Sequence, residues 1–379
     1  MPRPMGHIRI LFSSRVLLDL EEADQVFKEK GVDGYRDYML CTGAYEADRD
    51  PELGCRRFDK GPLFDMALAL NRLNQKAGKP LVELGMSAKD TIDTGLVLEK
   101  NLNASALAAA LTYSTSTSGG PVSEKAHRAF KTDLFLTRSD SDAQAAIDLG
   151  IAAAVMNFPP QGTYDFDHDL HPIHIVVDGD AVAFGDSAEV RYREALDTGK
   201  TPEEGLQIYV DGEKRDMGSP VEQGPFTALL TKLTQLNAQF PKGEAPFSLS
   251  LLTARGTEAR ARAIATALDH GIDFNGDCAY VSGAAKSDWL AAYRPHVFFD
   301  DQQAHLGPGA HFCPTGRVPY KTNGPMYEYL KRKELAANTN VHPKVAEAQV
   351  NAQDIAASPA AVVEQKPIKP SANPSAKPS

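Results

Sequence analysis

The sequence predicts an α/β protein in which helices flank a mostly parallel sheet, arranged as two similar halves with a small insertion in the second. Two observations support this fold class. Apolar runs of strand length alternate with helical stretches such as residues 143–149 and 259–268, which is the pattern of βαβ units. The first half of the chain also repeats, in degenerate form, the order of apolar runs and glycine turns found in the second half.

The repeat pairs each apolar run of the first half with one of the second. The run that ends at Ser13 corresponds to the run that ends at Asp178, 165 positions later. The turn at Gly61 corresponds to the turn at Gly224, and a helical pattern of leucines follows each. Residues 81–87 and 133–136 likewise resemble residues 248–253 and 296–299. A duplicated α/β unit is the favoured interpretation, and chance similarity between two generic strand–helix units is the alternative.

The two halves differ in their chemistry. Where the second half carries Asp178 and Asp180, the first carries Ser13 and Arg15. A hydroxyl and a cation cannot replace a nucleophilic, metal-binding carboxylate and a proton donor. We therefore expect the first half to be catalytically silent, as a scaffold or a substrate-binding lobe.

The domain boundaries follow from the repeat and from composition. We expect residues 1–160 to form a degenerate Rossmann-like half and residues 161–334 to form the catalytic half. Residues 186–223, between the first acidic motif and the Gly224 turn, are long enough for a small cap over the site. Residues 335–379 are rich in Ala, Pro and Lys and are expected to be disordered, because they cannot bury enough apolar surface.

Composition and charge limit the partners. The chain has 379 residues, of which 42% are hydrophobic and 24% are charged, as in ordinary globular proteins. Its net charge of −10 disfavours broad binding to nucleic-acid polymers or to anionic membranes. No apolar run reaches the roughly 20 residues that a membrane helix needs. The four cysteines form no Cys-x-x-Cys pair that would indicate a zinc site. We expect a cytoplasmic protein, and a homo-oligomer is compatible with this sequence.

Four motifs predict a site for phosphoryl transfer. Asp178 and Asp180 directly follow the apolar run 175–177, and Thr253, Lys286 and Asp300-Asp301 follow later runs or turns. The carboxyl ends of parallel strands form the usual ligand site of α/β sheets, so we expect these side chains to meet there. Taken alone, each motif is more often a turn, a helix cap or a solvated charge. Their joint order along the chain, at the ends of apolar runs, favours a common site instead.

The residue types fit the hydrolysis of a phosphate monoester that depends on Mg²⁺. Asp178 is expected to be the nucleophile and Asp180 the general acid and base. Oxygen atoms of Asp178, Asp180 (through its carbonyl) and Asp300 suit Mg²⁺, and Asp301 is a further ligand or orients one. Thr253 and Lys286 are expected to bind the phosphate. Arg15 and Arg255 are candidate contacts to phosphate or ribose, or else structural arginines.

These motifs resemble those of the haloacid-dehalogenase superfamily of phosphohydrolases. The stretches Val177-Asp-Gly-Asp-Ala-Val-Ala-Phe184, Leu252-Thr-Ala-Arg255 and Arg294-Pro-His-Val-Phe-Phe-Asp-Asp-Gln302 are similar to the cytosolic type I 5'-nucleotidases, which hydrolyse nucleoside monophosphates such as AMP. The resemblance covers about residues 8–320. It implies a haloacid-dehalogenase-type fold, a nucleoside monophosphate substrate and a role in nucleotide metabolism. It also implies the site roles given above for Asp178, Asp180, Thr253, Lys286 and Asp300.

Two other functions remain open. The chain could be a phosphatase of the same superfamily that acts on another small phosphomonoester, such as a sugar phosphate. It could also be a non-catalytic nucleotide-binding protein that keeps the fold. Phosphate release from a panel of substrates distinguishes a 5'-nucleotidase from the first alternative. Loss of turnover in a folded Asp178→Asn variant would exclude the second.

Overall fold

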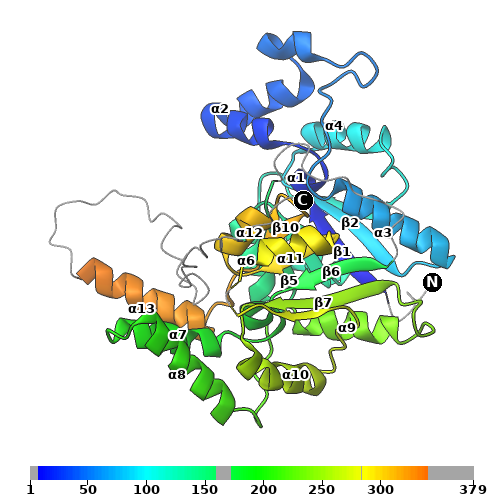
Figure 1. Ribbon diagram of the computed structural model, residues 1–379. Helices are drawn as coiled ribbons and strands as arrows, with labels where there is room; N and C mark the ends of the chain where they lie inside the picture. Colours follow the sequence, from blue (N-terminus) through cyan, green and yellow to red (C-terminus); the bar gives the residue numbers. More distant parts are fainter. Residues whose placement is uncertain (1–6, 159–171, 283, 340–379) are drawn as a thin grey trace, which may run out of the picture.

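The computed structural model describes residues 7–158, 172–282 and 284–339, and these residues form one ten-stranded sheet flanked by helices (Figure 1). The strand order is β3-β2-β1-β4-β5-β10-β9-β6-β7-β8. The strands are β1 Ile8–Ser13, β2 Val82–Ala88, β3 Leu111–Ser116, β4 Leu134–Thr137, β5 Ala152–Met156, β6 Ile173–Val177, β7 Phe247–Thr253, β8 Cys278–Tyr280, β9 Val297–Asp300 and β10 Thr315–Arg317. This mixed α/β architecture agrees with the predicted fold class.

Helices connect most successive strands. In the first half they are α1 Ser14–Leu17, α2 Glu21–Leu40, α3 Phe64–Ala77, α4 Ile92–Asn103, α5 Glu124–Phe130 and α6 Asp140–Asp148, with a 3-10 helix at Gly43–Asp48. In the second half they are α7 Ser187–Asp197, α8 Pro202–Arg215, α9 Thr227–Asn237, α10 Arg260–Asp269, α11 Lys286–Tyr293, α12 Gln303–Gly309 and α13 Pro325–Thr339, with a 3-10 helix at Thr257–Ala259. None of the described helices combines the length and the apolar character required to cross a bilayer.

The two halves of the sheet share one topology. The order β3-β2-β1-β4-β5 of the first half is repeated as β8-β7-β6-β9-β10 in the second. Strands within each half are parallel, and the halves join through the antiparallel pair β5 and β10. The carboxyl ends of the two sets of strands therefore point in opposite directions. This joint was not predicted, because a strand of three residues such as β10 carries no sequence signal of its direction.

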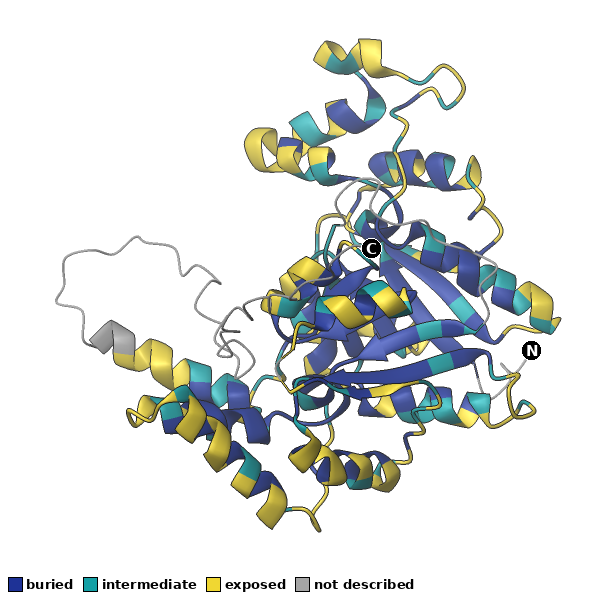
Figure 2. Cartoon of the chain, viewed as in Figure 1, coloured by how far each residue is buried: buried dark blue, intermediate teal, exposed yellow. Residues whose placement is uncertain are grey.

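The apolar runs of the central strands are buried on both faces. Ile175 and Val177 of β6 belong to the large core that includes Leu233 of α9. Val176, on the opposite face of the same strand, packs in a second core with Leu290 of α11. Strands covered on both faces read as continuous apolar runs rather than as alternating ones, which explains the pattern in the sequence. Figure 2 shows the sheet as the most buried layer of the molecule.

A similar isolated β-bridge follows the first strand of each half. Leu18 pairs with Lys60 in the first half, and Phe184 pairs with Gln223 in the second. The helical segment between the bridged residues therefore leaves the sheet and returns to it. In the first half this segment contains α2, and in the second half it contains α7 and α8. The matched bridges agree with the internal repeat seen in the sequence.

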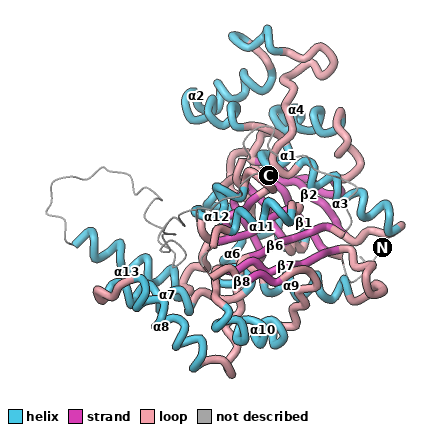
Figure 3. Tube along the Cα trace, viewed as in Figure 1, coloured by secondary structure: helices cyan, strands magenta, loops and turns pink. Residues whose placement is uncertain are grey.

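Helix α7 packs against both α8 and α13, and Figure 3 shows these three helices at the end of the molecule opposite to α2. Helix α8 begins with a capping box, because Thr201 accepts from the backbone N–H of Glu204 and Glu204 accepts from that of Thr201. Tyr329 of α13 donates to Asp197 of α7 at 2.9 Å. Helix α13 continues to Thr339, beyond the predicted start of the tail at residue 335. Residues 340–379 and the predicted boundary at 160/161 lie outside the described residues.

Gly224→Ala is expected to lower the free energy of unfolding by about 1–3 kcal/mol. A Cβ atom at this position would lie 2.2 Å from the carbonyl oxygen of Phe184 and 2.5 Å from that of Val182, so the backbone where the chain returns to the sheet must shift. Urea denaturation measures the change. Gly218→Ala is the matched control, because no described heavy atom lies within 4 Å of its added Cβ. Equal stability of the two variants would contradict this account of the turn.

Candidate active site

Two neighbouring strands deliver the central acids. β6 and β9 are parallel and adjacent, with Val177 opposite Phe299. The next residue of each strand, Asp178 and Asp300, therefore lies beside the other. β7 flanks β6 on its other side and ends at Thr253. The candidate site therefore lies at the carboxyl edge of the second half of the sheet, which is where ligands bind in open α/β sheets.

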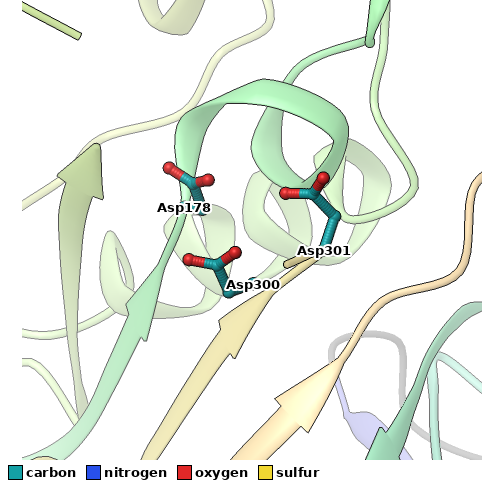
Figure 4. Close-up of side chains that lie close together, drawn as sticks. All are labelled: Asp178, Asp300 and Asp301. Carbon is teal, nitrogen blue, oxygen red and sulfur yellow. The ribbon is translucent and has the colours of Figure 1, made fainter. Parts of the chain in front are cut away.

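The side chains of Asp178, Asp300 and Asp301 form a buried acidic cluster. One carboxylate oxygen from each residue lies within 4.8 Å of those of the other two. Figure 4 shows the three side chains gathered at the ends of two neighbouring strands. All three residues are at most 4% exposed. Like charges at this distance in a buried site repel each other, so the cluster needs a nearby cation.

Lys286 supplies one positive charge to this cluster. It is the first residue of α11 and is only 1% exposed. Its Nζ lies 2.9 Å from Oδ1 of Asp178 and 2.7 Å from Oδ2 of Asp300. Three carboxylates against one ammonium leave an excess of negative charge when all are ionised.

The pKa values reflect this imbalance. Burial raises the pKa of Asp178 to about 7, against the effect of Lys286 and with the help of Asp300. Burial also raises the pKa of Asp301 well above its usual range, and the carboxylate of Glu189 adds to the rise. Burial opposes the charge of Lys286, but Asp178 and Asp300 raise its pKa above the ordinary value. A bound divalent cation would favour the ionised form of each acid.

The donor set of the cluster fits a hard cation. The hydroxyl of Tyr320 donates to Oδ2 of Asp301 at 2.6 Å. The other oxygen of Asp301, Oδ1, is buried and has no hydrogen-bond partner among the described residues. A buried oxygen without a partner is costly, and coordination of a cation would satisfy it. Carboxylate oxygens are the ligands that Mg²⁺ and Ca²⁺ prefer.

Thr253 lies against the turn that follows Asp178. A Cβ atom at Gly179 would lie 3.2 Å from Oγ1 of Thr253, closer than most such contacts. Gly179 therefore allows the turn to lie directly on the end of β7. Thr253 is 1% exposed, and its Oγ1 accepts from the backbone N–H of Arg255 at 3.3 Å.

Asp180 lies in a different arrangement from the other acids. It follows Asp178 by two residues in the turn Gly179–Ala183, where Asp180 has an extended backbone and Ala181 has a φ of 60°. Its carboxylate is paired with the guanidinium of Arg255, with Nη2 at 2.6 Å from Oδ1 and Nε at 3.0 Å from Oδ2. The structure thus places Arg255 beside Asp180, as a partner of this acid.

Arg15 is not brought to the acidic cluster. It follows β1, and β4, β5, β10 and β9 lie between this strand and β6. Its guanidinium pairs with Glu21 at 2.6 Å and with Asp24 at 3.0 Å. The position of Arg15 in the first half corresponds to that of Asp180 in the second, so the repeat explains why the motif around it is similar.

Two buried glutamates and one partly buried tyrosine near the site carried no sequence signal. Glu213 is 1% exposed and contacts Arg255, Glu189 is 7% exposed and pairs with Arg193, and Tyr320 contacts Asp301. Glu213 and Glu189 stand in strongly polar helical segments, which read as solvated faces. Only the packing of α7 and α8 against neighbouring segments of the second half shows that their carboxylates are buried.

Comparisons with known proteins agree with this geometry. A model of the 5'-nucleotidase family matches residues 1–324. Human cytosolic 5'-nucleotidase 1B is 26% identical over 316 residues, which are 80% of this chain and 47% of the relative, so the chain spans about half the length of that protein. No solved structure was found to match the chain. Because the family model covers most of the sequence, the chain belongs to the 5'-nucleotidase family, and within this family it is similar to the cytosolic type I members.

Proposed function

We propose that this protein is a Mg²⁺-dependent 5'-nucleotidase that hydrolyses nucleoside 5'-monophosphates such as AMP to nucleoside and phosphate. The observation that carries the proposal is the cluster of Asp178, Asp300 and Asp301 with Lys286, buried at one sheet edge in a chain of this family. It supports phosphoryl transfer because a phosphate dianion needs concentrated positive charge to be attacked by a carboxylate.

In the proposed mechanism, Asp178 is the nucleophile. A carboxylate oxygen of Asp178 forms a bond to phosphorus while the bond from phosphorus to the 5' oxygen breaks, and the carboxyl group of Asp180 gives its proton to that oxygen. The products of this step are the nucleoside and an aspartyl phosphate. Water then attacks phosphorus and gives a proton to Asp180, and the bond from phosphorus to Asp178 breaks to release phosphate.

Asp178, Asp300 and Asp301 would hold the cation, with the carbonyl oxygen of Asp180 as a further ligand. When bound, Mg²⁺ supplies the charge that offsets the phosphate and the carboxylates. Lys286 lies between Asp178 and Asp300 and would neutralise the transferring phosphoryl oxygens. Thr253, at the end of the adjacent strand, would donate its hydroxyl to the phosphate.

The two-helix insertion is proposed as a cap, and the first half as a scaffold. The segment from α7 to α8 leaves the sheet directly after the turn that bears Asp180 and returns at Gln223. A cap at this place would exclude water and contact the nucleoside. In the first half Ser13 and Arg15 stand where the second half has Asp178 and Asp180, which supports a silent role for residues 1–160.

Removal of divalent cations is expected to abolish phosphate release, and added Mg²⁺ to restore it. Asp301→Asn is expected to lower the affinity for Mg²⁺ by about 10–100-fold, because one oxygen ligand is lost. Binding to the folded state alone would also stabilise the wild type by about 2.7 kcal/mol at 100 times the Kd, so thermal unfolding with and without Mg²⁺ gives a second readout. Asp288→Asn, on the exposed side of α11, is the control. An Mg²⁺ requirement unchanged in Asp301→Asn would remove this residue from the site.

A substrate panel tests the proposed function. Phosphate release is measured from nucleoside 5'-monophosphates, sugar phosphates and p-nitrophenyl phosphate at equal concentration. The proposal predicts the highest kcat/KM for a nucleoside monophosphate. A preference for sugar phosphates would support a phosphatase of different specificity, and tight nucleotide binding without turnover would support a non-catalytic role.

A further inference from the structure

The carboxylate of the proposed proton donor, Asp180, is contacted by Arg255 and by Tyr209 of the inserted helix α8. Arg255 donates to both oxygens of the carboxylate, and the hydroxyl of Tyr209 lies 3.4 Å from Oδ2. A bidentate pair of this kind fixes the plane of a carboxylate as well as its position. The direction in which Asp180 points is therefore set by Arg255.

Arg255 is in turn fixed by Glu213. The Nη1 atom of Arg255 donates to Oε2 of Glu213, and Nη1 of Arg262 donates to Oε1 of the same carboxylate at 2.6 Å. Arg255 is 3% exposed and Glu213 is 1% exposed. Ion pairs this deeply buried are strongly oriented, because a broken pair leaves an uncompensated charge away from water.

The network joins the insertion to the core of the second half. Glu213 belongs to α8, Arg255 follows β7, and Arg262 belongs to α10. Tyr209, one turn before Glu213 on α8, packs in a buried cluster with Ala259, which directly precedes α10. Glu213 is thus the residue through which the position of α8 is transmitted to Arg255 and from there to Asp180.

We propose that Glu213 is a positioning residue for the protonation of the leaving oxygen, acting through Arg255 on Asp180. The inference rests on the proposed function. Without the carboxylate of Glu213, Arg255 loses its second anchor and can turn within the site, so Asp180 no longer points reliably toward the 5' oxygen. Lys286 pairs with Asp178 and Asp300, and Thr253 contacts the backbone N–H of Arg255 rather than its guanidinium, so binding of the phosphate by both residues should stay intact.

The variant Glu213→Gln tests the role with two leaving groups. A nucleoside 5' oxygen must be protonated as it leaves, whereas p-nitrophenolate leaves without a proton. Because kcat/KM reports the steps up to departure of the leaving group, we expect its value for AMP to fall about 10–100-fold, the range seen for residues that orient a functional group. We expect kcat/KM for p-nitrophenyl phosphate to stay within about threefold, as for a reaction that does not use the proton donor. Inhibition by inorganic phosphate should not change.

Asp211→Asn is the matched control, because Asp211 is an exposed acid on the same helix whose carboxylate accepts from Gln207. It should leave both kcat/KM values unchanged. If the buried Glu213→Gln variant does not fold, the double variant Glu213→Gln with Arg262→Gln removes one charge of each sign, and it should show the same selective loss. Circular dichroism and thermal unfolding establish that each variant is folded.

The outcomes separate this inference from the proposed function. An equal loss of kcat/KM for both substrates, or no loss for either, in a folded variant of an active wild type would overturn the role of Glu213 alone. A wild type that releases phosphate from none of these substrates would overturn the proposed function and the role of Glu213 with it.

Discussion

Asp178→Asn is expected to lower kcat for AMP by about 10⁴-fold or more, the size of loss seen when a covalent nucleophile is removed. An amide neither attacks phosphorus as a carboxylate does nor forms the aspartyl phosphate. The protein should remain folded, because the change removes one of three buried like charges while Lys286 keeps its pair with Asp300. Steady-state phosphate release and thermal unfolding measure the two effects.

The internal repeat offers a matched control for this variant. Ser13 occupies the position of Asp178 in the first half, and its buried Oγ has no hydrogen-bond partner among the described residues. Ser13→Ala is expected to leave kcat unchanged. Phosphate release by Asp178→Asn within about tenfold of the wild type would exclude Asp178 as the nucleophile, since covalent catalysis accounts for a far larger factor.

Asp180→Asn is expected to lower kcat/KM for AMP by about 10²–10⁴-fold, the usual contribution of a general acid. The value for p-nitrophenyl phosphate should change little, because p-nitrophenolate leaves without a proton. The later attack of water still needs Asp180 as a base, so the aspartyl phosphate should accumulate. Rapid mixing with p-nitrophenyl phosphate should then give a burst of one p-nitrophenolate per enzyme, followed by slow turnover.

An absent burst together with equal losses on both substrates would contradict the acid and base role of Asp180. It would indicate that Asp180 acts mainly by holding the turn and Arg255 in place. The wild type, examined under the same conditions, shows whether the burst is specific to the variant.

The sequence predicts the central part of the candidate site because short stretches around each residue mark the strand end at which it lies. Asp178 and Asp300 each end an apolar run, and parallel strands bring such ends to one edge of a sheet. Thr253 and Lys286 stand at element boundaries that glycine and apolar patterns mark. The structure places these four residues at one edge of the sheet, and their roles remain proposals.

The remaining features depend on contacts between distant segments. The antiparallel pairing of β5 with β10 decides that Arg15 lies far from the acidic cluster, and nothing in either short strand signals that pairing. The burial of Glu213 depends on the packing of α8 against Arg255 and Arg262, although its helix is polar in sequence. Local patterns cannot report such contacts.

The first half carries opposite charges at the two positions that correspond to Asp180 and Arg255. Arg15 and Asp90 stand 165 positions before Asp180 and Arg255. Arg15 pairs with Glu21 and Asp24, so the first half does not reproduce the pair of Asp180 and Arg255. The exchange removes the acid that the proposed reaction requires, which is consistent with the proposed silent role of the first half.

A crystal structure of the protein with Mg²⁺ and beryllofluoride would identify the nucleophile, because beryllofluoride binds a nucleophilic carboxylate in place of a phosphoryl group. We expect beryllofluoride on the carboxylate of Asp178 and one Mg²⁺ that contacts both Asp178 and Asp300. Beryllofluoride on another residue, or Mg²⁺ bound away from these two acids, would exclude the proposed roles of Asp178 and Asp300.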